Sequence, residues 1–468
     1  MSQRRLATES VEDKEVPMKT PSKSRAALAV ALAAALSAGA CSGAGGGDEG
    51  EGGSITIATV ANPQMQDIEQ LSEVFEEETG IDVQFVVLPE NELRDKVTQD
   101  IATGSGQYDI VTIGTYETPI WAENGWLAPL DDYASDPDYD VDDLLPPVRE
   151  ALTYEDGLYA VPFYGESSFL MYRTDLFEAA GVTMPANPTW QEVADLAAQL
   201  HDPENDVAGI CLRGLAGWGE VLAPLNTVIN TFGGRWYDED WNAQLTSPET
   251  KAAVQFYVDL VSRYGEPGAP NAGFSECLTA TSQGNAAMWV DATVAASILE
   301  DPNSSDAAGK MAYVPAPVVE TDSSGWLWAW SLAIPESSQS KDAAWEFMAW
   351  ATGKDYMHLV GEELGWTRVP PGSRASTYEI PEYAEAAAAF APQTLEAIEA
   401  VDVTQPGLYE QNWTGVQYIT IPEFQDLGTR VAQEISAAIA GNQTVDEALE
   451  KAQGYAEEVA ESGGYKDQ

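Results

Sequence analysis

The alternation of strand-like and helix-like segments after residue 54 is the feature that most limits the fold of this chain. A β-rich run at 55–60 is followed by a helical pattern at 65–79 and by a strand-like run at 81–88. A second helical pattern, from 91 to 104, leads into a buried strand at 109–113. This strand–helix–strand–helix–strand order is typical of a parallel sheet with helices on its faces, so we expect an α/β fold.

The first 40 residues differ in kind from the rest. They hold six basic and four acidic residues and end in an uncharged run rich in Ala, Leu and Val at 26–40. Such a pattern is typical of a secretory signal peptide, and about 15 apolar residues are too few to span a bilayer. The Ala-Gly-Ala triplet before Cys41 resembles a bacterial lipobox, which predicts a palmitate-type lipid anchor on Cys41. The alternative is a plain secreted protein with one leftover cysteine.

Residues 41–54 read as a lipid-anchored flexible linker. After Cys41 this segment consists of Gly, Ser, Ala and acidic residues, none of which can build a packed core. We therefore expect the globular body to lie outside the cell, attached to the membrane through the N-terminal lipid. Later in the chain no run of 18 uninterrupted apolar residues occurs, so no further membrane span is expected.

The charge of the chain limits its partners. It has 76 acidic and 22 basic residues, a formal net charge of −54. Such a surface repels nucleic acids and anionic lipids, so we expect no nucleic-acid partner. Most of the acids are interpreted as a solvated outer surface, which makes the scarce basic residues and the tryptophans better guides to a ligand site.

Several stretches resemble the sugar-binding lipoproteins of bacterial ABC importers, the family that includes maltose-binding protein. The matching stretches, in order, are YDIV (108–111), GWLAPL (125–130), LYAVPFYGESSFLMYRTD (158–175), TWQE (189–192) and GNQTVDEAL (441–449). Four others look more like the branch associated with mannitol and sorbitol. They are 209–220, 288–297, 325–335 and 365–378.

This resemblance implies a fold of the periplasmic-binding-protein type II kind, with two α/β lobes and a ligand cleft at the hinge. The implied lobe I covers 55–165 plus 329–400, and lobe II covers 166–328 plus 401–468. It also implies an extracytoplasmic substrate-binding component that captures a polyol or small sugar and delivers it to the membrane permease. We expect a monomer without catalytic activity, cofactor or metal.

A neutral polyhydroxylated ligand needs hydrogen-bonding side chains and aromatic faces. Trp326 and Trp328 share one face of a predicted strand near a crossing, either as a cleft wall or as a core stripe. Glu166 falls on a position that contacts sugar in the maltose-binding pattern; the alternative is a surface acid. Tyr116 and Glu117 follow the strand at 109–113, at the edge of a parallel sheet where clefts lie.

Arginine is scarce, with nine after residue 40. Arg213 and Arg368 are chosen as clamps for hydroxyl groups, against the alternative of structural ion pairs. Asp291 interrupts a buried run and is either a ligand acceptor or a helix cap. The candidate ligand contacts are Tyr116, Glu117, Glu166, Arg213, Trp218, Asp291, Trp326, Trp328, Trp366, Arg368 and Trp413.

Cysteine and histidine are rare, which limits both metal chemistry and catalysis. Three cysteines and two histidines exclude a zinc ribbon or a multi-histidine metal site. In an oxidising compartment Cys211 and Cys277 either form a disulfide or remain free, since the sequence gives no distance between them. No GxSxG, GxxxxGK[ST] or GxGxxG motif accompanies His201 or His358. The remaining enzymatic alternative is a secreted carbohydrate-active hydrolase that uses paired carboxylates.

Overall fold

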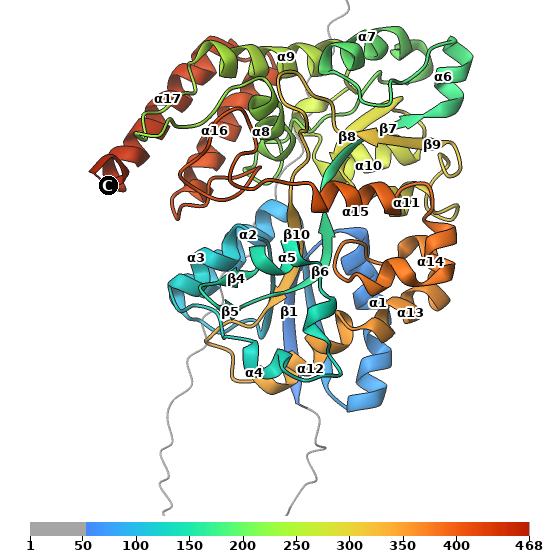
Figure 1. Ribbon diagram of the computed structural model, residues 1–468, viewed down its shortest axis with the longest axis vertical. Helices are drawn as coiled ribbons and strands as arrows, with labels where there is room; N and C mark the ends of the chain where they lie inside the picture. The colour runs from blue at the N-terminus through green and yellow to red at the C-terminus, as the bar shows by residue number, and fades with distance from the viewer. Residues whose placement is uncertain (1–52, 468) are drawn as a thin grey trace, which may run out of the picture. The chain divides into compact units, whose positions relative to one another are not determined.

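The predicted strand–helix alternation is confirmed, and it builds the larger of two main sheets (Figure 1). The computed structural model describes residues 53–467; the predicted signal peptide, the predicted lipidation site at Cys41 and nearly all of the predicted linker lie outside them. This sheet has the order β2-β1-β3-β10-β6. Its strands are β1 (Ser54–Val60), β2 (Asp82–Leu88), β3 (Ile110–Ile113), β6 (Val161–Glu166) and β10 (Trp328–Ala333). The first three are parallel, whereas β10 runs antiparallel to β3 and β6.

Helices cover this sheet because each presents an apolar face to it. Helix α1 (Pro63–Thr79) buries Phe75, whose ring lies 5.1 Å from that of Phe347 on α12 (Lys341–Ala351). It ends at Gly80, which has a φ of 75° that favours glycine. Helix α2 (Glu90–Thr103) packs on β1 and β2 from the segment that follows β2. Sheet and helices form the first lobe.

The second lobe contains a three-stranded antiparallel sheet. Its order is β8-β7-β9, from β7 (Ser168–Arg173), β8 (Met288–Ala292) and β9 (Met311–Pro315). A helical layer packs beside it. The bounds in this layer are α7 (Trp190–Leu200), α8 (Leu222–Thr231), α9 (Pro248–Tyr264), α16 (Phe424–Ile439) and α17 (Val445–Ser462). Helices α7 and α17 begin with capping boxes at Thr189 and Thr444.

Within residues 53–467, the chain passes between the lobes at three places. Only Ser167 separates β6 of the first sheet from β7 of the second. The second passage precedes β10, and the third follows α15 (Ala391–Glu399). Helix α15 lies at the junction, because it contacts β6 of one sheet and β7 and β9 of the other (Figure 1). The exact limits proposed for the two lobes stay a prediction.

The remaining α-helices and strands are short. They are α3 (Glu117–Glu123), α4 (Asp131–Ala134), α5 (Pro146–Ala151), α6 (Thr174–Ala180), α10 (Phe274–Ser282), α11 (Ala295–Leu299), α13 (Lys354–Glu363), α14 (Pro381–Ala386), β4 (Thr153–Tyr154) and β5 (Gly157–Leu158). Among residues 53–467, no helix combines the length and the apolar character that a membrane crossing requires.

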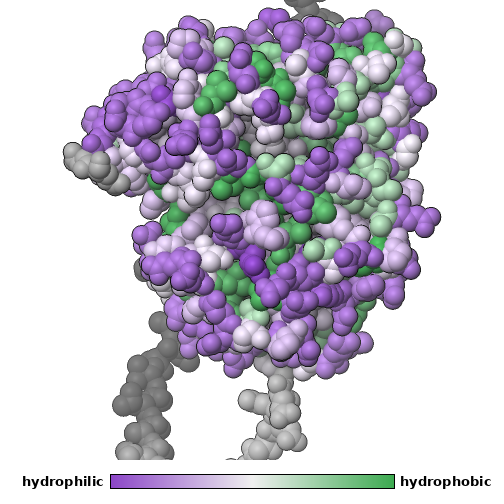
Figure 2. All heavy atoms as spheres, viewed as in Figure 1, coloured by the Kyte–Doolittle hydropathy of each residue, from purple (hydrophilic) through white to green (hydrophobic). Residues whose placement is uncertain are grey.

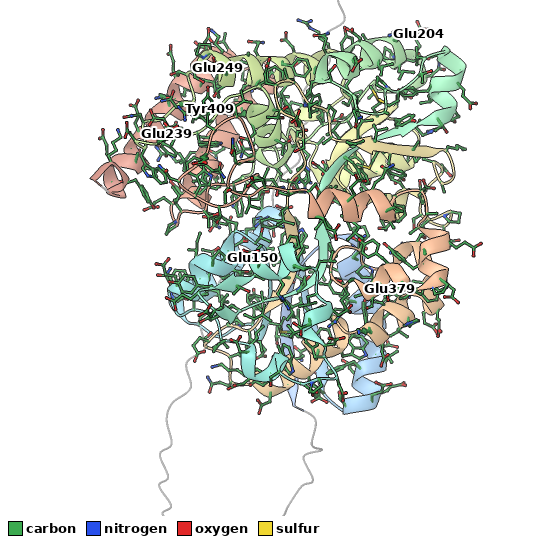
Figure 3. The ribbon with its side chains drawn as sticks, in the orientation of Figure 1. Glu150, Glu204, Glu239, Glu249, Glu379 and Tyr409 are labelled. Atoms are coloured by element: carbon green, nitrogen blue, oxygen red, sulfur yellow. A yellow bond between two sulfur atoms is a disulfide. The ribbon has the colours of Figure 1, made fainter. Side chains whose placement is uncertain are left out.

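Acidic side chains dominate the outer surface. On the face shown in Figure 2, hydrophilic residues cover most of the surface and hydrophobic residues form smaller separate patches. The glutamates labelled in Figure 3, such as Glu150 and Glu249, are exposed at the periphery. Water solvates these carboxylates, so most of the negative charge has no part in a buried site.

Candidate functional site

A small polar cavity lies between the two lobes, where β6 and β10 approach the second lobe. Its volume is about 20 Å³, which is room for a water molecule rather than for a ligand of several carbons. The two lobes are therefore closed tightly around it. The cavity is lined by Asn62, Glu90, Arg94, Tyr164, Glu166, Arg213, Gly219, Ala223, Phe274, Ala292, Trp328, Trp330, Gln417 and Tyr418.

Arg94 supplies the charge from the first lobe. It projects from the second turn of α2, where its Nη2 lies 2.9 Å from Glu90 Oε1, one turn earlier on the helix. Its Nη1 pairs with Glu117 at the start of α3. The guanidinium also lies 3.9 Å from the centre of the Trp218 ring. Burial alone would lower the pKa of Arg94, but Glu90 and Glu117 outweigh it and raise that pKa, so Arg94 stays charged.

Arg213 supplies the charge from the second lobe. Its Nε donates to Asp291 Oδ2 at 2.8 Å, and its Nη2 lies 2.5 Å from Asp291 Oδ1, which makes a bidentate pair. Its Nη1 donates to the carbonyl of Gly219 at 3.0 Å and lies 3.5 Å from Glu220. Asp291 is fully buried and also accepts the indole N–H of Trp289 at 3.1 Å. Each arginine is thus held by two carboxylates in one fixed orientation.

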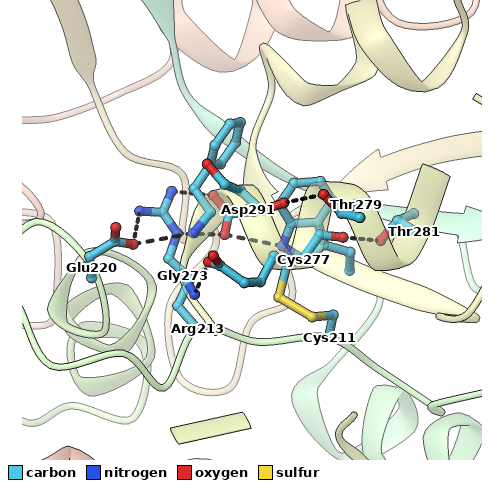
Figure 4. The surroundings of a disulfide bond; sticks show 12 residues. Cys211, Arg213, Glu220, Gly273, Cys277, Thr279, Thr281 and Asp291 are labelled. Carbon is cyan, nitrogen blue, oxygen red and sulfur yellow. Dashed lines mark hydrogen bonds and ion pairs between the residues drawn. A yellow bond between two sulfur atoms is a disulfide. The ribbon is translucent and has the colours of Figure 1, made fainter. Parts of the chain in front are cut away.

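A disulfide next to Arg213 ties this part of the site to α10. Cys211 and Cys277 are bonded, with their Cα atoms 5.6 Å apart (Figure 4). Cys211 lies two residues before Arg213, and Cys277 lies on α10. Phe274, at the start of α10, lines the cavity, and its ring centre is 5.2 Å from the Arg213 guanidinium. The bond therefore holds two wall segments together.

Two carboxyl groups of the cavity region are tuned toward their neutral forms. Burial raises the pKa of Glu166 well above its usual range; Arg213 opposes this, and Asp291 and Glu90 add to it. Burial and Glu90 likewise raise the pKa of Glu220 to about 8, against the lowering effect of Arg213. A protonated carboxyl group can donate a hydrogen bond as well as accept one. The cavity region therefore offers both kinds of partner to hydroxyl groups.

Aromatic side chains complete the wall. Trp328 and Trp330 of β10 both line the cavity, and their rings meet edge to face with centres 5.6 Å apart. Tyr418, from the segment after α15, packs against Trp328 at 5.3 Å. Such faces suit the C–H sides of a polyol or sugar.

Three of the predicted ligand contacts line the cavity: Glu166, Arg213 and Trp328. Others lie one layer behind it. Glu117 and Trp218 hold Arg94, and Asp291 holds Arg213.

Tyr116 and Trp326 also lie outside the lining. The hydroxyl of Tyr116 donates to the carbonyl of Ile421 at 3.0 Å, and its ring packs on Trp218. Trp326 is buried, and its indole nitrogen has no hydrogen-bond partner among the described residues.

Three predicted contacts are not brought to the cavity. Arg368 pairs with Asp67 and Asp301, and Trp366 packs over Gly361 beside His358. Trp413 packs against Trp241, with ring centres 5.6 Å apart. Arg368 matches the structural ion pair that the sequence left open as the alternative.

Several residues that line the cavity were not among the predicted ligand contacts, above all Asn62, Glu90 and Arg94. Asn62 follows β1 directly, and Glu90 and Arg94 follow β2. The rule that ligands bind beyond the carboxyl ends of parallel strands, which selected Tyr116, applies equally to these positions. The scarcity of arginine pointed in the same direction, since Arg94 is one of nine after residue 40.

Comparison with known proteins places this geometry in a family. The family model described as bacterial extracellular solute-binding protein matches residues 61–358. The mannitol-binding protein of Pseudomonas aeruginosa is 46% identical over 414 residues, covering 88% of this chain and 94% of that protein.

Solved structures of similar proteins agree with this match. An ABC-transporter solute-binding protein from Agrobacterium vitis with bound D-mannitol has a TM-score of 0.86 and 50% identity, covering 88% of this chain and 99% of that one. One from Agrobacterium radiobacter in complex with ribitol has a TM-score of 0.78 and 26% identity, covering 87% and 99%. The predicted fold, two α/β lobes of the periplasmic-binding-protein type II kind, is confirmed. The chain belongs to the family of bacterial extracellular solute-binding proteins.

Proposed function

We propose that this protein is the extracytoplasmic substrate-binding component of an ABC importer and that it binds a linear polyol of the mannitol type between its lobes. The observation that carries the proposal is the pair of clamped arginines, Arg94 and Arg213, which reach one cavity from opposite lobes. The similar proteins named above bind mannitol and ribitol, which supports a polyol.

The charge balance of the site favours a neutral ligand. Two guanidinium groups lie among five carboxyl groups: Glu90, Glu117, Glu166, Glu220 and Asp291. Even when Glu166 and Glu220 are protonated, three carboxylates face two guanidinium groups. An added anion would therefore meet net negative charge in a buried space, where like charges repel strongly. We therefore expect the site to accept a sugar alcohol and to reject the corresponding sugar acid.

Binding by lobe closure fits the contacts between the lobes. Gln64 of α1 donates to Ser297 of α11 at 2.8 Å, and Arg368 Nη1 pairs with Asp301 at 3.2 Å. The ring of Tyr116 in the first lobe also packs on Trp218 in the second. A ligand that touches both lobes adds to these contacts and so shifts the balance between open and closed forms. A permease that recognises the closed form would then receive only the loaded protein.

The finer parts of the proposal concern anchoring, partners and catalysis. We infer a monomer that is tethered to the cell membrane through Cys41 and that docks on ABC permease subunits. It carries out no chemical step on its ligand. The similar proteins named above are binding proteins, which supports this view over the hydrolase alternative.

The test is calorimetry with mannitol, sorbitol, ribitol and the sugar acid mannonate. We expect one binding site for a hexitol, no measurable heat with mannonate, and a higher melting temperature in the presence of the bound polyol. Glu166→Gln should change the affinity, and Glu150→Gln, on the exposed surface, should not. Turnover of a glycoside, or failure of all polyols and sugars to bind, would overturn the proposal.

A further inference from the structure

A second cavity, of about 240 Å³, lies at the hinge. All three passages between the lobes contribute to its lining. Ser168 belongs to the first passage, Ser324 and Gly325 to the second, and Val401 and Gln405 to the third. It is much larger than the cavity between the two arginines, and the two share no lining residue.

One wall of this hinge cavity is a face of α15. Gln393, Glu396, Ala397 and Ala400 recur at helical spacing along it and all line the cavity. Glu399 lies on the same helix but outside the lining. Phe169 and Val401 add apolar surface beside this face. A short alkyl chain in this cavity would therefore contact apolar side chains on more than one side.

The charged residues that line the hinge cavity are all acidic. Asp322, Glu396 and Asp402 line it, and no Lys, Arg or His does. Hydrogen bonds from Thr404 and Gln405 hold the pKa of Asp402 below its usual range, so this carboxylate is charged at neutral pH. Such a lining attracts a cation.

Two buried oxygens at this cavity also lack a hydrogen-bond partner. Ser168 is 2% exposed, and its Oγ has no partner among residues 53–467. The same holds for Oε1 of Gln393. A buried polar atom without a partner costs free energy, which a ligand that donates hydrogen bonds would recover after a small side-chain rotation.

We propose that the hinge cavity binds a small alkylammonium ion, with its carbon chain on the α15 face and its ammonium groups toward Glu396, Asp402 and Asp322. An alkane diamine is the simplest molecule of this class. Nothing in the proposed polyol function requires this site, so it would be a second, separate ligand site.

A ligand bound in the hinge cavity would change polyol binding at the cavity between the two arginines. Glu166 lines the cavity between the two arginines. Ser168, two residues later on the same passage, lines the hinge cavity. Hinge closure changes the backbone angles of such passages and so moves the walls of a cavity built from them. A hinge ligand that prefers one lobe arrangement must then change the affinity of the protein for the polyol. Bound polyol must change the affinity for the hinge ligand by the same factor. This coupling, unlike the site itself, rests on the proposed polyol function.

The site is tested by calorimetry of the full mature chain with 1,6-diaminohexane, with hexane-1,6-diol as the neutral control. We expect one diamine site and at least tenfold weaker binding of the diol. Glu396→Gln should weaken diamine binding about tenfold, because a charged hydrogen-bond acceptor is lost. Glu399→Gln, the same change on the same helix, should leave it unaltered. Ala397→Phe, which fills the cavity without a charge change, should abolish it.

Equal diamine affinity in Ala397→Phe and in the parent chain would overturn the proposal, since it would show unspecific attraction to the acidic surface. Absence of diamine binding, or equal losses in Glu396→Gln and Glu399→Gln, would do the same. Coupling is read separately, from mannitol affinity and X-ray scattering with and without diamine. If a diamine binds and no polyol does, the proposed function is wrong and the proposed hinge site is still supported. If diamine changes neither mannitol affinity nor scattering, the coupling is wrong.

Discussion

The guanidinium of Arg94 lies 3.9 Å from the centre of the Trp218 ring, so a charge from α2 of the first lobe rests on an indole of the second. The same guanidinium is held by Glu90, which lines the cavity, and by Glu117, which lies behind the cavity wall. The Arg94 side chain thus both contacts the second lobe and lines the ligand cavity.

Arg94→Lys should weaken polyol binding by about tenfold or more, as measured by calorimetry. A lysine ammonium cannot lie flat on an indole and hold two carboxylates in a planar fork at once. Arg430→Lys is the matched control, because Arg430 lies 3.9 Å from the Tyr455 ring on the surface, away from the cavity. Unchanged affinity in Arg94→Lys would show that the cavity is not where the ligand binds.

Removal of the Cys211–Cys277 bond should lower the free energy of unfolding by about 4 kcal/mol, because the bond closes a loop of 66 residues. Urea unfolding of the double variant Cys211→Ser, Cys277→Ser would measure this loss. Reduction of the parent chain should have a similar effect, and Cys41→Ser should have none. Polyol affinity should also fall, since Arg213 and Phe274 would no longer be held together. Full stability after removal would contradict the role assigned to the bond.

Glu266 should make stability depend on pH. Burial raises its pKa to about 7, and neither carboxylate oxygen has a hydrogen-bond partner among the described residues. In the unfolded chain this group ionises near pH 4.5, so between pH 4.5 and 7 the folded form binds more protons than the unfolded form. Its contribution to stability is therefore present below pH 4.5 and is lost as the pH rises to about 7.

Glu266→Gln should consequently raise the free energy of unfolding at pH 7.5 by on the order of 2 kcal/mol and flatten its pH dependence. Urea titrations at several pH values would measure this. Glu204→Gln, on the exposed surface, is the control. An unchanged pH slope would mean that the carboxylate is ionised in the folded form.

Arg368 should act on closure rather than on the ligand. It bridges Asp67 of α1 and Asp301, which follows α11 in the second lobe. Asp301→Asn should weaken polyol binding by a few-fold, because the closed form loses one interlobe ion pair, worth about 1 kcal/mol in a partly exposed setting. The change should appear as faster ligand release in stopped-flow fluorescence. A loss of several hundredfold would instead indicate a direct ligand contact, as the sequence had suggested for Arg368.

The order of strands and helices predicted from the sequence for residues 55–113 agrees with the order in the structure. Apolar spacing at Ile68, Leu71 and Phe75, and the stop at Gly80, located α1, because both signals depend only on neighbours in sequence. The capping boxes at Thr189 and Thr444 likewise involve only residues three apart in sequence. The resemblance to sugar-binding proteins led to Glu166, the scarcity of arginine to Arg213, and the period-2 spacing of tryptophans on a predicted strand to Trp328; all three line the cavity.

What the sequence determined by itself was thus the local order of the fold, the family, and the scarcity of the groups that can form a site. The tertiary structure decided which of nine arginines face the cavity. Arg94 does and Arg368 does not, although both pair with two carboxylates. It also decided that Cys211 and Cys277 are bonded. The reason is distance in sequence: local pattern fixes which face of a helix or strand is apolar, but side chains far apart along the chain are brought together only by tertiary packing.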